Sequence, residues 1–519
     1  MLRARLPPAT LSEVSTLPLS RHNGPVPRSN PSPSDRSKTG TDFLQLDIDD
    51  APQGGVSSWL TEQLRAAIAD GRLPVGSRVP PGRVLADELR VSRGVVTEAY
   101  RRLIEDGQLA GKGRSGTFVV AAPVARPSSI GRQIPRDRTH ADFTNPPDHD
   151  VFDLLRASPA EIDLTPGVPD LAAFPRGAWL RAERRVLDDL DPTHFGYGDP
   201  RGAPPFRRAV ADWLARNRGI RVEPDHVVIV TGVAQALDLV ARVLMNDGIN
   251  EIAVEDPGSL GVRQHLASRR LHTPPIPVDQ YGLRVDALRA SGAPAVALTP
   301  AHQFPTGVVL DGGRRRELVS WAETTGGLIL EDDYDAEHRY DRPPVQAVHT
   351  LMPDRVFYTG SVSKTLAPAL RTGWLVAPPS YRDPIVIAKR YADLGNAVLP
   401  QLVLTELMES GELERHLRML RRRHRRRRDA MIAAIHAHLP QAHIHGAAAG
   451  LHLTITFDNV FTDTALAAAA LDLGVKTQPL SWHHQLPSAP GLVLGYAATP
   501  PADAARGIEL IHRALRRIT

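Results

Sequence analysis

The sequence predicts a multidomain protein, with a small α+β domain near the N-terminus and a larger α/β domain that ends in a small α+β lobe. Three observations carry this prediction. Between residues 55 and 120, three helical stretches are followed by two short strand-like stretches around a glycine turn. From residue 161 onward, apolar strand-like runs alternate with helical stretches, which is typical of a largely parallel sheet. A chain of 519 residues is also too long for one compact core.

Composition excludes several classes of protein. The chain has no cysteine, which rules out a disulfide scaffold, a thiolate zinc site, an iron–sulfur cluster and a cysteine nucleophile. No apolar run approaches the roughly 20 residues of a membrane helix, and the N-terminus lacks the apolar core of a signal peptide. We therefore expect a cytoplasmic protein with no membrane partner and no metal site. The formal net charge of +4 permits an anionic partner without requiring one.

Four segments are predicted along the chain. Residues 1–42, rich in Pro, Ser and Arg, are expected to be a disordered leader. Residues 43–121 form the small domain, and residues 122–160, with repeated prolines, form a semi-stiff linker. Residues 161–519 form the larger domain.

The small domain has the pattern of a winged helix-turn-helix. Apolar residues at helical spacing predict a first helix around Leu60–Ile68. A short helix is predicted over Arg83–Leu89 and a longer one over Arg93–Glu105. Strands at 108–110 and 117–120 flank the glycine-rich tip GKGRSG. Helices followed by such a hairpin are typical of this fold.

A domain of this kind commonly reads DNA. The second helix of the motif enters the major groove, and its first residues contact base edges. Arg93 begins that helix and can bind guanine through two hydrogen bonds. The residues predicted to contact DNA are Arg83, Ser92, Arg93, Thr97, Lys112 and Arg114. The alternative is a solvated helical domain that contacts proteins, because the same fold is also used away from DNA.

The sequence of residues 63–119 resembles the DNA-binding domain of GntR-family bacterial repressors. The resemblance rests on the turn G-R-L-x-x-G-x-R-x-P, on V-S-R-x-x-V at the recognition helix and on S-G-T-F-V in the wing. Pro81-Gly82 replace two small polar residues that usually cap the second helix, so we expect different capping here. Gly94-Val95 stand where the family commonly has Thr or Ala followed by Thr, a change that can remove one base contact.

Apolar runs predict the strands of the larger domain. They cover residues 227–232, 251–256, 295–300, 327–333 and 355–361. Helical stretches separate them, and the last 120 or so residues alternate helix and strand in a way that indicates a smaller α+β lobe. Ligands bind at the carboxyl ends of strands in open parallel sheets.

Three of those strand ends carry groups that suit an aldehyde cofactor with a phosphate. Lys364 follows the strand at 355–361 and can form a Schiff base, and Asp332 at the end of 327–333 can pair with a pyridinium nitrogen. Tyr334 can bond the phenolic oxygen of such a ring. The phosphate could be bound by Ser361, Ser363, Arg371 and the helix that starts after Thr231-Gly232.

Residues 43–519 resemble the MocR-type regulators, which join a GntR-like reader to a fold-type I aminotransferase-like domain. The resemblance is based on the sequence motifs HFGYGDPRG, TPAHQFPTG, EDDYDAEHRY and SVSKTLAPALRTGWLV. It implies a domain of the pyridoxal 5′-phosphate (PLP)-dependent transferase fold in which Lys364 is the Schiff-base lysine and Asp332 pairs with the ring nitrogen. The other cofactor-binding residues that it implies are Tyr334, Val233, Ala234, Ser361, Ser363 and Arg371, with His302 and Gln303 beside the ring. Tyr197 would reach the phosphate of a neighbouring subunit, which implies a homodimer.

Two departures from the aminotransferases concern the substrate side of the site. Ser259 stands where the family often has an aromatic residue that stacks on the ring. The stretch GLVLGYAAT, residues 491–499, has no arginine where many aminotransferases bind the substrate carboxylate. The residues considered as replacements are Arg263, Lys476, His483 and His484. Both departures indicate weak transamination or a different effector.

The leading interpretation is a transcription regulator that binds operator DNA and senses PLP, alone or with an amine or amino acid. One alternative is an active PLP-dependent aminotransferase with an appended DNA-binding domain. Another is a DNA-binding structural protein whose cofactor site is vestigial. The run RRRHRRRR, Arg421–Arg428, is either a solvated face of a long helix or an auxiliary contact to DNA phosphates.

Overall fold

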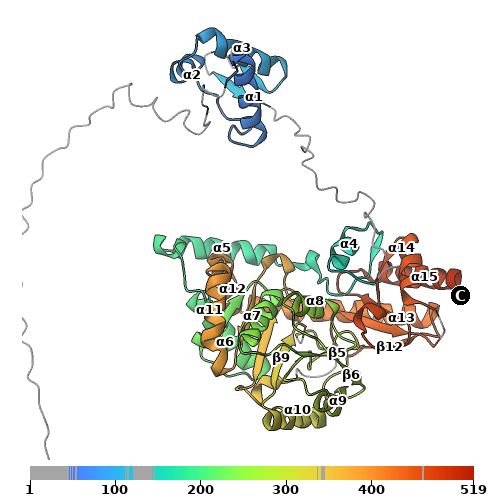
Figure 1. Cartoon of the computed structure of the whole chain (residues 1–519). Coiled ribbons are helices and arrows are strands. Elements are labelled where there is room, and N and C mark those ends of the chain that lie inside the picture. Colours follow the sequence, from blue (N-terminus) through green and yellow to red (C-terminus); the bar gives the residue numbers. More distant parts are fainter. Residues whose placement is uncertain are drawn as a thin grey trace, which may run out of the picture. The chain divides into compact units, whose positions relative to one another are not determined.

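The structure, a computed structural model, divides the chain into two compact units, Met1–Ile134 and Pro135–Thr519 (Figure 1). It describes residues 55–111, 116–120, 146–335, 337–340, 345–458 and 461–519, together with Leu46, Ile48, Ala51, Pro52, Gly113 and Phe143. The leader predicted for residues 1–42 lies outside the described residues, as do residues 122–142, 144 and 145 of the predicted linker.

The first unit is the predicted winged helix-turn-helix. Its elements are α1 (Val56–Ala69), α2 (Gly82–Glu88), α3 (Arg93–Glu105), β1 (Leu109–Gly111) and β2 (Thr117–Val119). The helices pack through Leu60, Leu64, Val96 and Leu103, which recur at helical spacing and are buried. Strands β1 and β2 form an antiparallel hairpin. Helix α2 begins after Pro81 with no side-chain cap, as the loss of the polar pair predicts.

The second unit is built on an eight-stranded sheet with the order β4-β11-β10-β9-β8-β5-β6-β7. The strands are β4 (Val227–Val230), β5 (Ala253–Asp256), β6 (Pro275–Asp279), β7 (Gly282–Leu283), β8 (Ala295–Leu298), β9 (Leu328–Asp333), β10 (Val356–Ser361) and β11 (Gly373–Val376). Each of the five predicted runs contains a strand of this sheet. Neighbouring strands from β6 to β10 are parallel, whereas β11 is antiparallel to both β10 and β4.

Both faces of the sheet are apolar, and helices cover them. In β4, Val228 and Val230 pack on one side with α7 (Val233–Asn246) and α11 (Arg382–Asp393). Val227 and Ile229 pack on the other side, where further helices lie. Those are α6 (Pro204–Arg218), α12 (Val398–Glu409), α9 (Val285–Ser291) and α10 (Gly312–Thr325). Because successive strand side chains point to opposite faces, a strand buried on both faces needs a continuous apolar run.

The predicted small lobe forms the C-terminal part of this unit, drawn in red in Figure 1. Its four-stranded antiparallel sheet has the order β12-β13-β16-β15. The lobe contains β12 (His443–His445), β13 (His452–Thr456), β15 (Gln478–Pro479), β16 (Gly491–Gly495), α14 (Asp463–Asp472) and α15 (Pro501–Ile518). The short strand β14 (Val475–Lys476) pairs in parallel with β3 (Ile162–Asp163).

A single long helix, α13 (Glu412–His438), belongs to two cores at once. Leu413 and Leu417 pack with the helices against the large sheet. Met431 and Ile435 pack in the core of the small lobe. The helix therefore connects the two parts without a break.

The arginine run lies in the middle of α13, and three of its seven arginines have a role that neither interpretation of the sequence anticipated. Arg423 and Arg427 form ion pairs with buried Asp170, at 3.0 and 2.9 Å. Arg428 donates to the carbonyl oxygen of Ala447 at 2.8 Å, and its guanidinium lies 5.0 Å from the ring centroid of Tyr340. These three arginines hold parts of the fold together, whereas the exposed side of the run is formed by Arg422, Arg425 and Arg426.

The structure differs from the predicted linker over its last residues. Helix α4 (Val151–Ala157) lies inside that range, and Val151 and Leu155 are buried in the core of the small lobe. Phe143 stacks on Trp482 of the same core with ring centroids 5.3 Å apart. The second unit therefore begins well before residue 161, because these apolar side chains bury against it.

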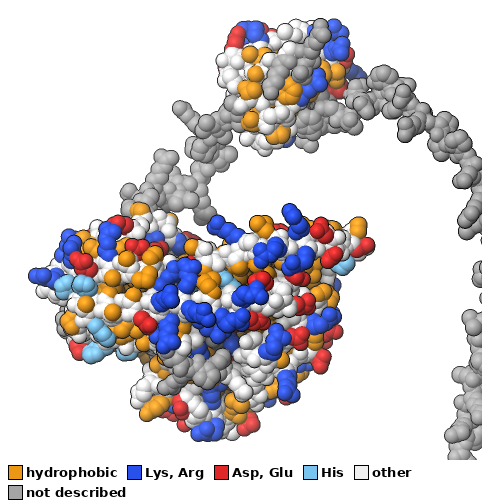
Figure 2. Space-filling model, turned by 180° about the vertical axis from the view of Figure 1, so that it is seen from behind, with side chains coloured by type: hydrophobic (Ala, Val, Ile, Leu, Met, Phe, Trp, Pro, Cys, Tyr) orange, Lys and Arg blue, Asp and Glu red, His pale blue; other side chains and the backbone are white. Residues whose placement is uncertain are grey.

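The surface of the second unit is mixed in charge. Figure 2 shows Lys and Arg side chains gathered across the middle of one face, with acidic and apolar side chains beside them. Such a face suits an anionic partner. In the part of the chain that the structure describes, no helix is long and apolar enough to cross a membrane.

Candidate functional site

In the first unit, the side chains predicted to contact DNA gather at the start of the recognition helix. Ser92, Arg93 and Thr97 are exposed on α3 or directly before it, and Arg83 is exposed on α2. Arg83 and Arg93 form no ion pair with the described residues. By contrast, other arginines of this unit are paired with carboxylates, namely Arg65, Arg72, Arg101 and Arg102. The tip residues Lys112 and Arg114 lie outside the described residues.

In the second unit, a pocket with a volume of about 680 Å³ lies where β9 and β10 end. Its lining contains eight of the predicted cofactor residues. They are Lys364, Asp332, Tyr334, Val233, Ala234, Ser361, Ser363 and Arg371. Residues far apart in the sequence meet here because parallel strands bring their carboxyl ends to one edge of the sheet.

The pleat of β9 separates its three consecutive carboxylates. Glu331 accepts hydrogen bonds from the backbone N–H groups of Val348 and His349, both at 2.9 Å. Asp332, between the two, lines the pocket, and its nearest protein partner is the Thr359 hydroxyl at 3.4 Å.

Buried Asp333 has its partners elsewhere. Its Oδ2 lies 2.5 Å from Arg218 Nε and accepts from the Tyr358 hydroxyl, also at 2.5 Å. Asp332 is therefore the acidic side chain of β9 that remains available to a ligand in the pocket.

The electrostatics of the pocket favour a cationic ring nitrogen beside Asp332. Burial raises the pKa of Asp332 to about 7, and the carboxylates Asp333 and Asp335 add to the increase. Burial also lowers the pKa of Lys364, against the opposing effect of Asp335 and Asp332. Lys364 Nζ donates to the carbonyl oxygen of Gly167 at 2.5 Å. A carboxylate that forms no ion pair with the described residues suits a protonated pyridine ring, and a lysine with a lowered pKa suits a nucleophilic amine.

The start of α7 forms a cradle that suits a phosphate. Gly232, with φ of +86°, turns the chain into the helix, and the first residues Val233 and Ala234 line the pocket. Arg371 donates to the carbonyl oxygen of Thr231 and has the left-handed φ of +45°, an unusual conformation for a non-glycine residue. Such strain occurs where a side chain must be held in one place. Together with Ser361 and Ser363, these groups offer helix N–H donors, hydroxyls and a guanidinium.

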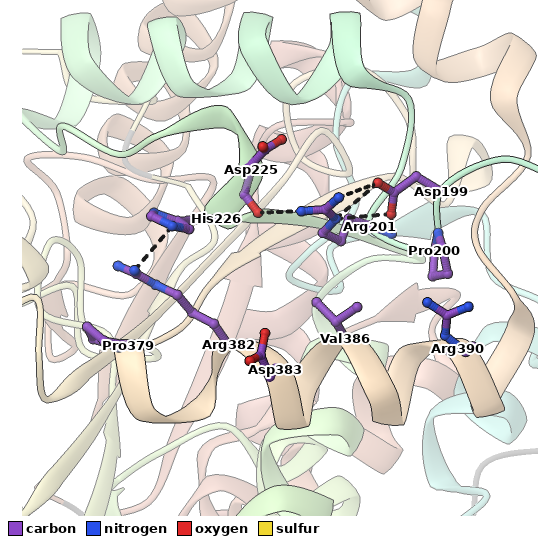
Figure 3. Close-up of a pocket in the computed structure, with 10 residues that line it drawn as sticks. All are labelled: Asp199, Pro200, Arg201, Asp225, His226, Pro379, Arg382, Asp383, Val386 and Arg390. Carbon is purple, nitrogen blue, oxygen red and sulfur yellow. Dashed lines mark hydrogen bonds and ion pairs between the residues drawn. The ribbon is translucent and has the colours of Figure 1, made fainter. Parts of the chain in front are cut away.

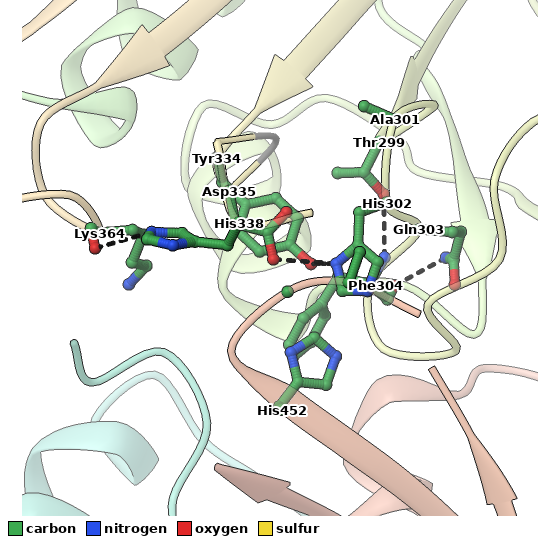
Figure 4. Close-up of polar contacts among 12 residues, drawn as sticks. Thr299, Ala301, His302, Gln303, Phe304, Tyr334, Asp335, His338, Lys364 and His452 are labelled. Atoms are coloured by element: carbon green, nitrogen blue, oxygen red, sulfur yellow. Dashed lines mark hydrogen bonds and ion pairs between the residues drawn. The ribbon is translucent and has the colours of Figure 1, made fainter. Parts of the chain in front are cut away.

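A second layer of side chains holds Tyr334 (Figure 4). His302 Nδ1 lies 2.9 Å from Asp335 Oδ2 and 3.0 Å from the Tyr334 hydroxyl. Because a carboxylate only accepts, His302 donates from Nδ1 to Asp335. Burial alone would raise the pKa of Asp335, but the neighbouring His302, His452 and His338 together lower that pKa. Asp335 therefore orients His302, and His302 positions Tyr334.

Three predicted residues lie outside the pocket lining. His302 hydrogen-bonds to Tyr334 from outside the lining, and Gln303 ties its turn to the segment after β5 by donating to Pro257 O at 2.7 Å. Phe304, which the sequence did not single out, lines the pocket from this segment. Tyr197, 97% exposed, follows the short helix η5 (Pro192–Phe195) at the surface. Its predicted reach into a neighbouring subunit stays a prediction.

The four residues considered for binding a substrate carboxylate differ in whether they line the pocket. Arg263 donates to the carbonyl oxygen of Trp482 at 2.6 Å, and Lys476 Nζ lies 3.3 Å from Asp163 Oδ2. Neither lines the pocket, and neither does His484, whereas His483 does. Ser259 also lines it, but its hydroxyl accepts from Val262 N as the cap of α8 (Leu260–Ser268).

Several other residues that line the Lys364 pocket were not singled out from the sequence. The segment before Asp170 contributes Thr165, Pro166 and Gly167, and the small lobe contributes His452 and Gln478. The one signal in the sequence was the Pro-Gly turn at 166–167, where Gly167 has φ of +84°.

A second cleft, of about 640 Å³, lies beside α11 (Figure 3). Arg201 Nη2 pairs with Asp199 Oδ2 at 2.7 Å, and Arg382 donates from Nη1 to His226 Nε2 at 3.2 Å. The charged groups of this cleft largely satisfy one another, and its lining contains no lysine. The pocket around Lys364 is therefore the better candidate for a reactive site.

Two families match the chain. The family described as "Bacterial regulatory proteins, gntR family" matches residues 57–119, and "Aminotransferase class I and II" matches residues 160–503. The probable rhizopine catabolism regulatory protein MocR of Rhizobium meliloti is 32% identical over 476 residues, which cover 88% of this chain and 92% of that protein. The chain belongs to the MocR-type transcriptional regulators. It is thus a DNA-binding regulator that carries an aminotransferase-like domain.

Further similarities agree with this membership. The pyridoxine biosynthesis transcriptional regulator PdxR of Corynebacterium glutamicum is 32% identical over 424 residues, which cover 80% of this MocR-type chain and 87% of PdxR. Among solved structures, kynurenine aminotransferase of Pyrococcus horikoshii matches with a TM-score of 0.65 and 25% identity, over 71% of this chain and 93% of that one. The second unit therefore has the fold-type I aminotransferase fold that the sequence predicts.

Proposed function

We propose that this MocR-type regulator holds PLP in the pocket around Lys364 and responds to a primary amine or amino acid that reacts there. The observation that carries the proposal is that Lys364, Asp332, Tyr334 and the start of α7 line the same pocket. PLP supplies an aldehyde that reacts with amines and a ring that withdraws electrons.

Each group has a distinct role in this proposal. Lys364 Nζ holds the cofactor covalently, and Asp332 keeps the ring nitrogen protonated. Tyr334, positioned by His302, donates a hydrogen bond to the ring oxygen. The phosphate is held by Val233, Ala234, Ser361, Ser363 and Arg371, which resemble the set that the aminotransferases use.

We further propose that the regulator works as a homodimer. Large apolar side chains are exposed on α5 (Arg176–Asp189) and directly after it. They are Leu180 at 65%, Leu187 at 46%, Phe195 at 62% and Tyr197 at 97% exposure. A second copy of the chain would cover them and would bring Tyr197 of each copy to the phosphate of the other. Light scattering on the purified protein tests this, since a monomer at micromolar concentration contradicts it.

The regulatory logic is thermodynamic linkage. An effector changes DNA affinity only if it binds the DNA-competent and DNA-incompetent arrangements with different affinity. The anisotropy of labelled operator DNA, titrated with the protein in the presence and absence of amines, measures that difference. Unchanged DNA affinity with every amine and amino acid tried would contradict effector sensing.

The cofactor proposal has a direct chemical test. The purified protein is expected to absorb visible light, and borohydride reduction followed by peptide mapping should find the label on Lys364. The variant Lys364→Ala should lose the label, whereas Lys476→Arg, at a lysine outside the pocket, should keep it. Protein that binds no PLP under any condition would refute the proposal.

A further inference from the structure

The small lobe, together with Phe304 from the large sheet's side, supplies a part of the pocket wall that differs from the rest in its chemistry. We call this part the lobe wall, and it consists of Phe304, Leu451, His452, Gln478 and His483. Phe304 comes from the turn after β8 and packs against the two histidines, with ring centroids 4.9 Å from His452 and 5.0 Å from His483. The polar members are almost fully buried, with exposures of 1% for His452, 6% for Gln478 and 1% for His483.

His452 presents a hydrogen-bond acceptor. Its Nε2 lies 3.1 Å from the carbonyl oxygen of Pro305, which also accepts from the Thr454 hydroxyl at 2.5 Å. A carbonyl oxygen only accepts, so His452 Nε2 carries the proton and Nδ1 keeps its lone pair. Among the described residues, Nδ1 has no hydrogen-bond partner.

Gln478 presents a hydrogen-bond donor. His483 Nδ1 accepts from the backbone N–H of Leu260 at 3.4 Å, so His483 Nε2 carries the proton. That N–H donates to Gln478 Oε1 at 3.2 Å, which fixes the orientation of the amide. The Gln478 NH₂ group therefore remains for a ligand.

The lobe wall carries no formal charge. Burial is the largest cause that lowers the pKa of His452 to about 4 and that of His483 to about 3, so both imidazoles are neutral near pH 7. Two arginines line the pocket in the described part of the chain, Arg371 at the phosphate cradle and Arg156. Arg156 pairs with Asp153, and its side chain is 71% exposed. A ligand carboxylate next to the lobe wall would lack a buried cationic partner, which is costly in a desolvated site.

We propose, on the basis of the amine-sensing function above, that the lobe wall selects a primary amine without a carboxylate and with an uncharged, hydroxyl-bearing aromatic tail. The amine nitrogen would form its bond to the aldehyde carbon of the cofactor as the bond from that carbon to Lys364 Nζ breaks, and Lys364 would leave as a free amine. The aromatic ring packs against Phe304 and Leu451. The hydroxyl donates to His452 Nδ1 and accepts from the Gln478 NH₂ group. A hydroxyl can use both groups at once, whereas a carboxylate can only accept.

Three commercial compounds isolate the two features of this ligand. Tyramine has the amine, ring and hydroxyl, L-tyrosine adds a carboxylate, and phenethylamine lacks the hydroxyl. Calorimetric titration of the full-length, cofactor-loaded protein should give a dissociation constant for tyramine at least about tenfold below that of L-tyrosine. Phenethylamine should bind about three- to tenfold more weakly than tyramine, because one neutral hydrogen-bonding contact is lost.

A pair of variants tests the lobe wall itself. Gln478→Glu keeps the acceptor for His483 but removes the NH₂ donor, so tyramine should bind no better than phenethylamine. Gln485→Glu makes the same change at an exposed position outside the lining and should leave both affinities unchanged. If Gln478→Glu does not fold, the comparison of ligands on the unaltered protein still decides the question.

The outcomes separate this inference from the function on which it rests. Protein without cofactor absorbance refutes the proposed function. Cofactor-loaded protein that binds L-tyrosine more tightly than tyramine, or that binds none of the three compounds, refutes the lobe-wall inference alone. Loss of L-tyrosine binding in Arg156→Ala would then assign the carboxylate contact to Arg156.

Discussion

The buried ion pair behind β9 allows a quantitative prediction. Arg218, 3% exposed, lies 2.5 Å from Asp333 Oδ2 through Nε and 2.8 Å from Glu337 Oε1 through Nη2. Arg218→Met keeps a similar side-chain length but leaves two buried carboxylates without this counter-charge. Breaking one partner of a buried pair typically costs about 3–5 kcal/mol. We expect the free energy of unfolding of the second unit to fall by about that amount at pH 8.

The size of the loss should depend on pH. Burial raises the pKa of Glu337, and the variant removes the opposing effect of Arg218, so this carboxyl binds a proton more readily in the folded state than in the unfolded state. The cost of the Glu337 carboxylate is therefore fully present above its raised folded-state pKa and fades as pH falls toward its ordinary range of about 4. Urea unfolding followed by tryptophan fluorescence between pH 5 and pH 8 measures this trend.

Two further variants serve as controls. Arg216→Met removes an arginine that is 56% exposed and 3.8 Å from Glu414, so the stability should change by less than about 0.5 kcal/mol. Combining Arg218→Met with Asp333→Asn and Glu337→Gln should restore most of the lost free energy of unfolding, because neither former partner of Arg218 then carries a charge. A loss below about 1 kcal/mol in Arg218→Met, or one that does not vary with pH, would refute the reasoning.

Three other predictions concern the two sites. Asp332→Asn should weaken PLP binding but stabilise the cofactor-free protein at pH 8, because a carboxyl whose pKa is raised to about 7 destabilises the fold above that pH; a lower melting temperature at pH 8 than that of the unaltered protein would contradict this. Arg93→Ala should weaken specific operator binding by about 1–3 kcal/mol and leave random DNA unaffected; equal losses on both DNAs would identify a phosphate contact instead. Amino-group transfer from amino acids to 2-oxoglutarate should be far slower than about 1 s⁻¹, since no arginine holds the carboxylate in the described lobe wall; turnover at ordinary rates, measured by product analysis, would favour the enzyme interpretation.

Local signals account for the parts that the sequence predicted well. The recognition helix runs over Arg93–Glu105 as expected, because Ser92 and Gly107 mark its ends and the apolar residues keep helical spacing. The strands of the large sheet were visible because burial on both faces demands continuous apolar runs. Lys364 and Asp332 could be predicted to share one pocket because each follows or ends a strand of a parallel sheet, and such strands bring their carboxyl ends to one edge.

Features that depend on distant partners were not visible in the sequence. Helix α4 is short and lies among prolines, and most residues of the core that it joins lie more than 250 residues later in the sequence. In the acidic stretch after Leu330, Arg218 pairs with Asp333 and His302 pairs with Asp335, and both partners come from distant parts of the sequence. His302 lies outside the pocket lining and contacts Tyr334 and Asp335, and this pairing with Asp335 could not be read from the sequence.

The continuity of α13 has a mechanical consequence. At 27 residues, the helix is about 40 Å long at the usual rise per residue. An unbroken helix resists bending, so a tilt at its lobe end moves its sheet end as well. Asp170, held by Arg423 and Arg427 at mid-length, belongs to the segment that runs along the pocket through Gly167, Val168 and Leu171. A ligand that displaces the small lobe would therefore also move the segment that lines the pocket at Gly167, Val168 and Leu171. It would move the sheet end of α13, which packs with α6 and α12, at the same time.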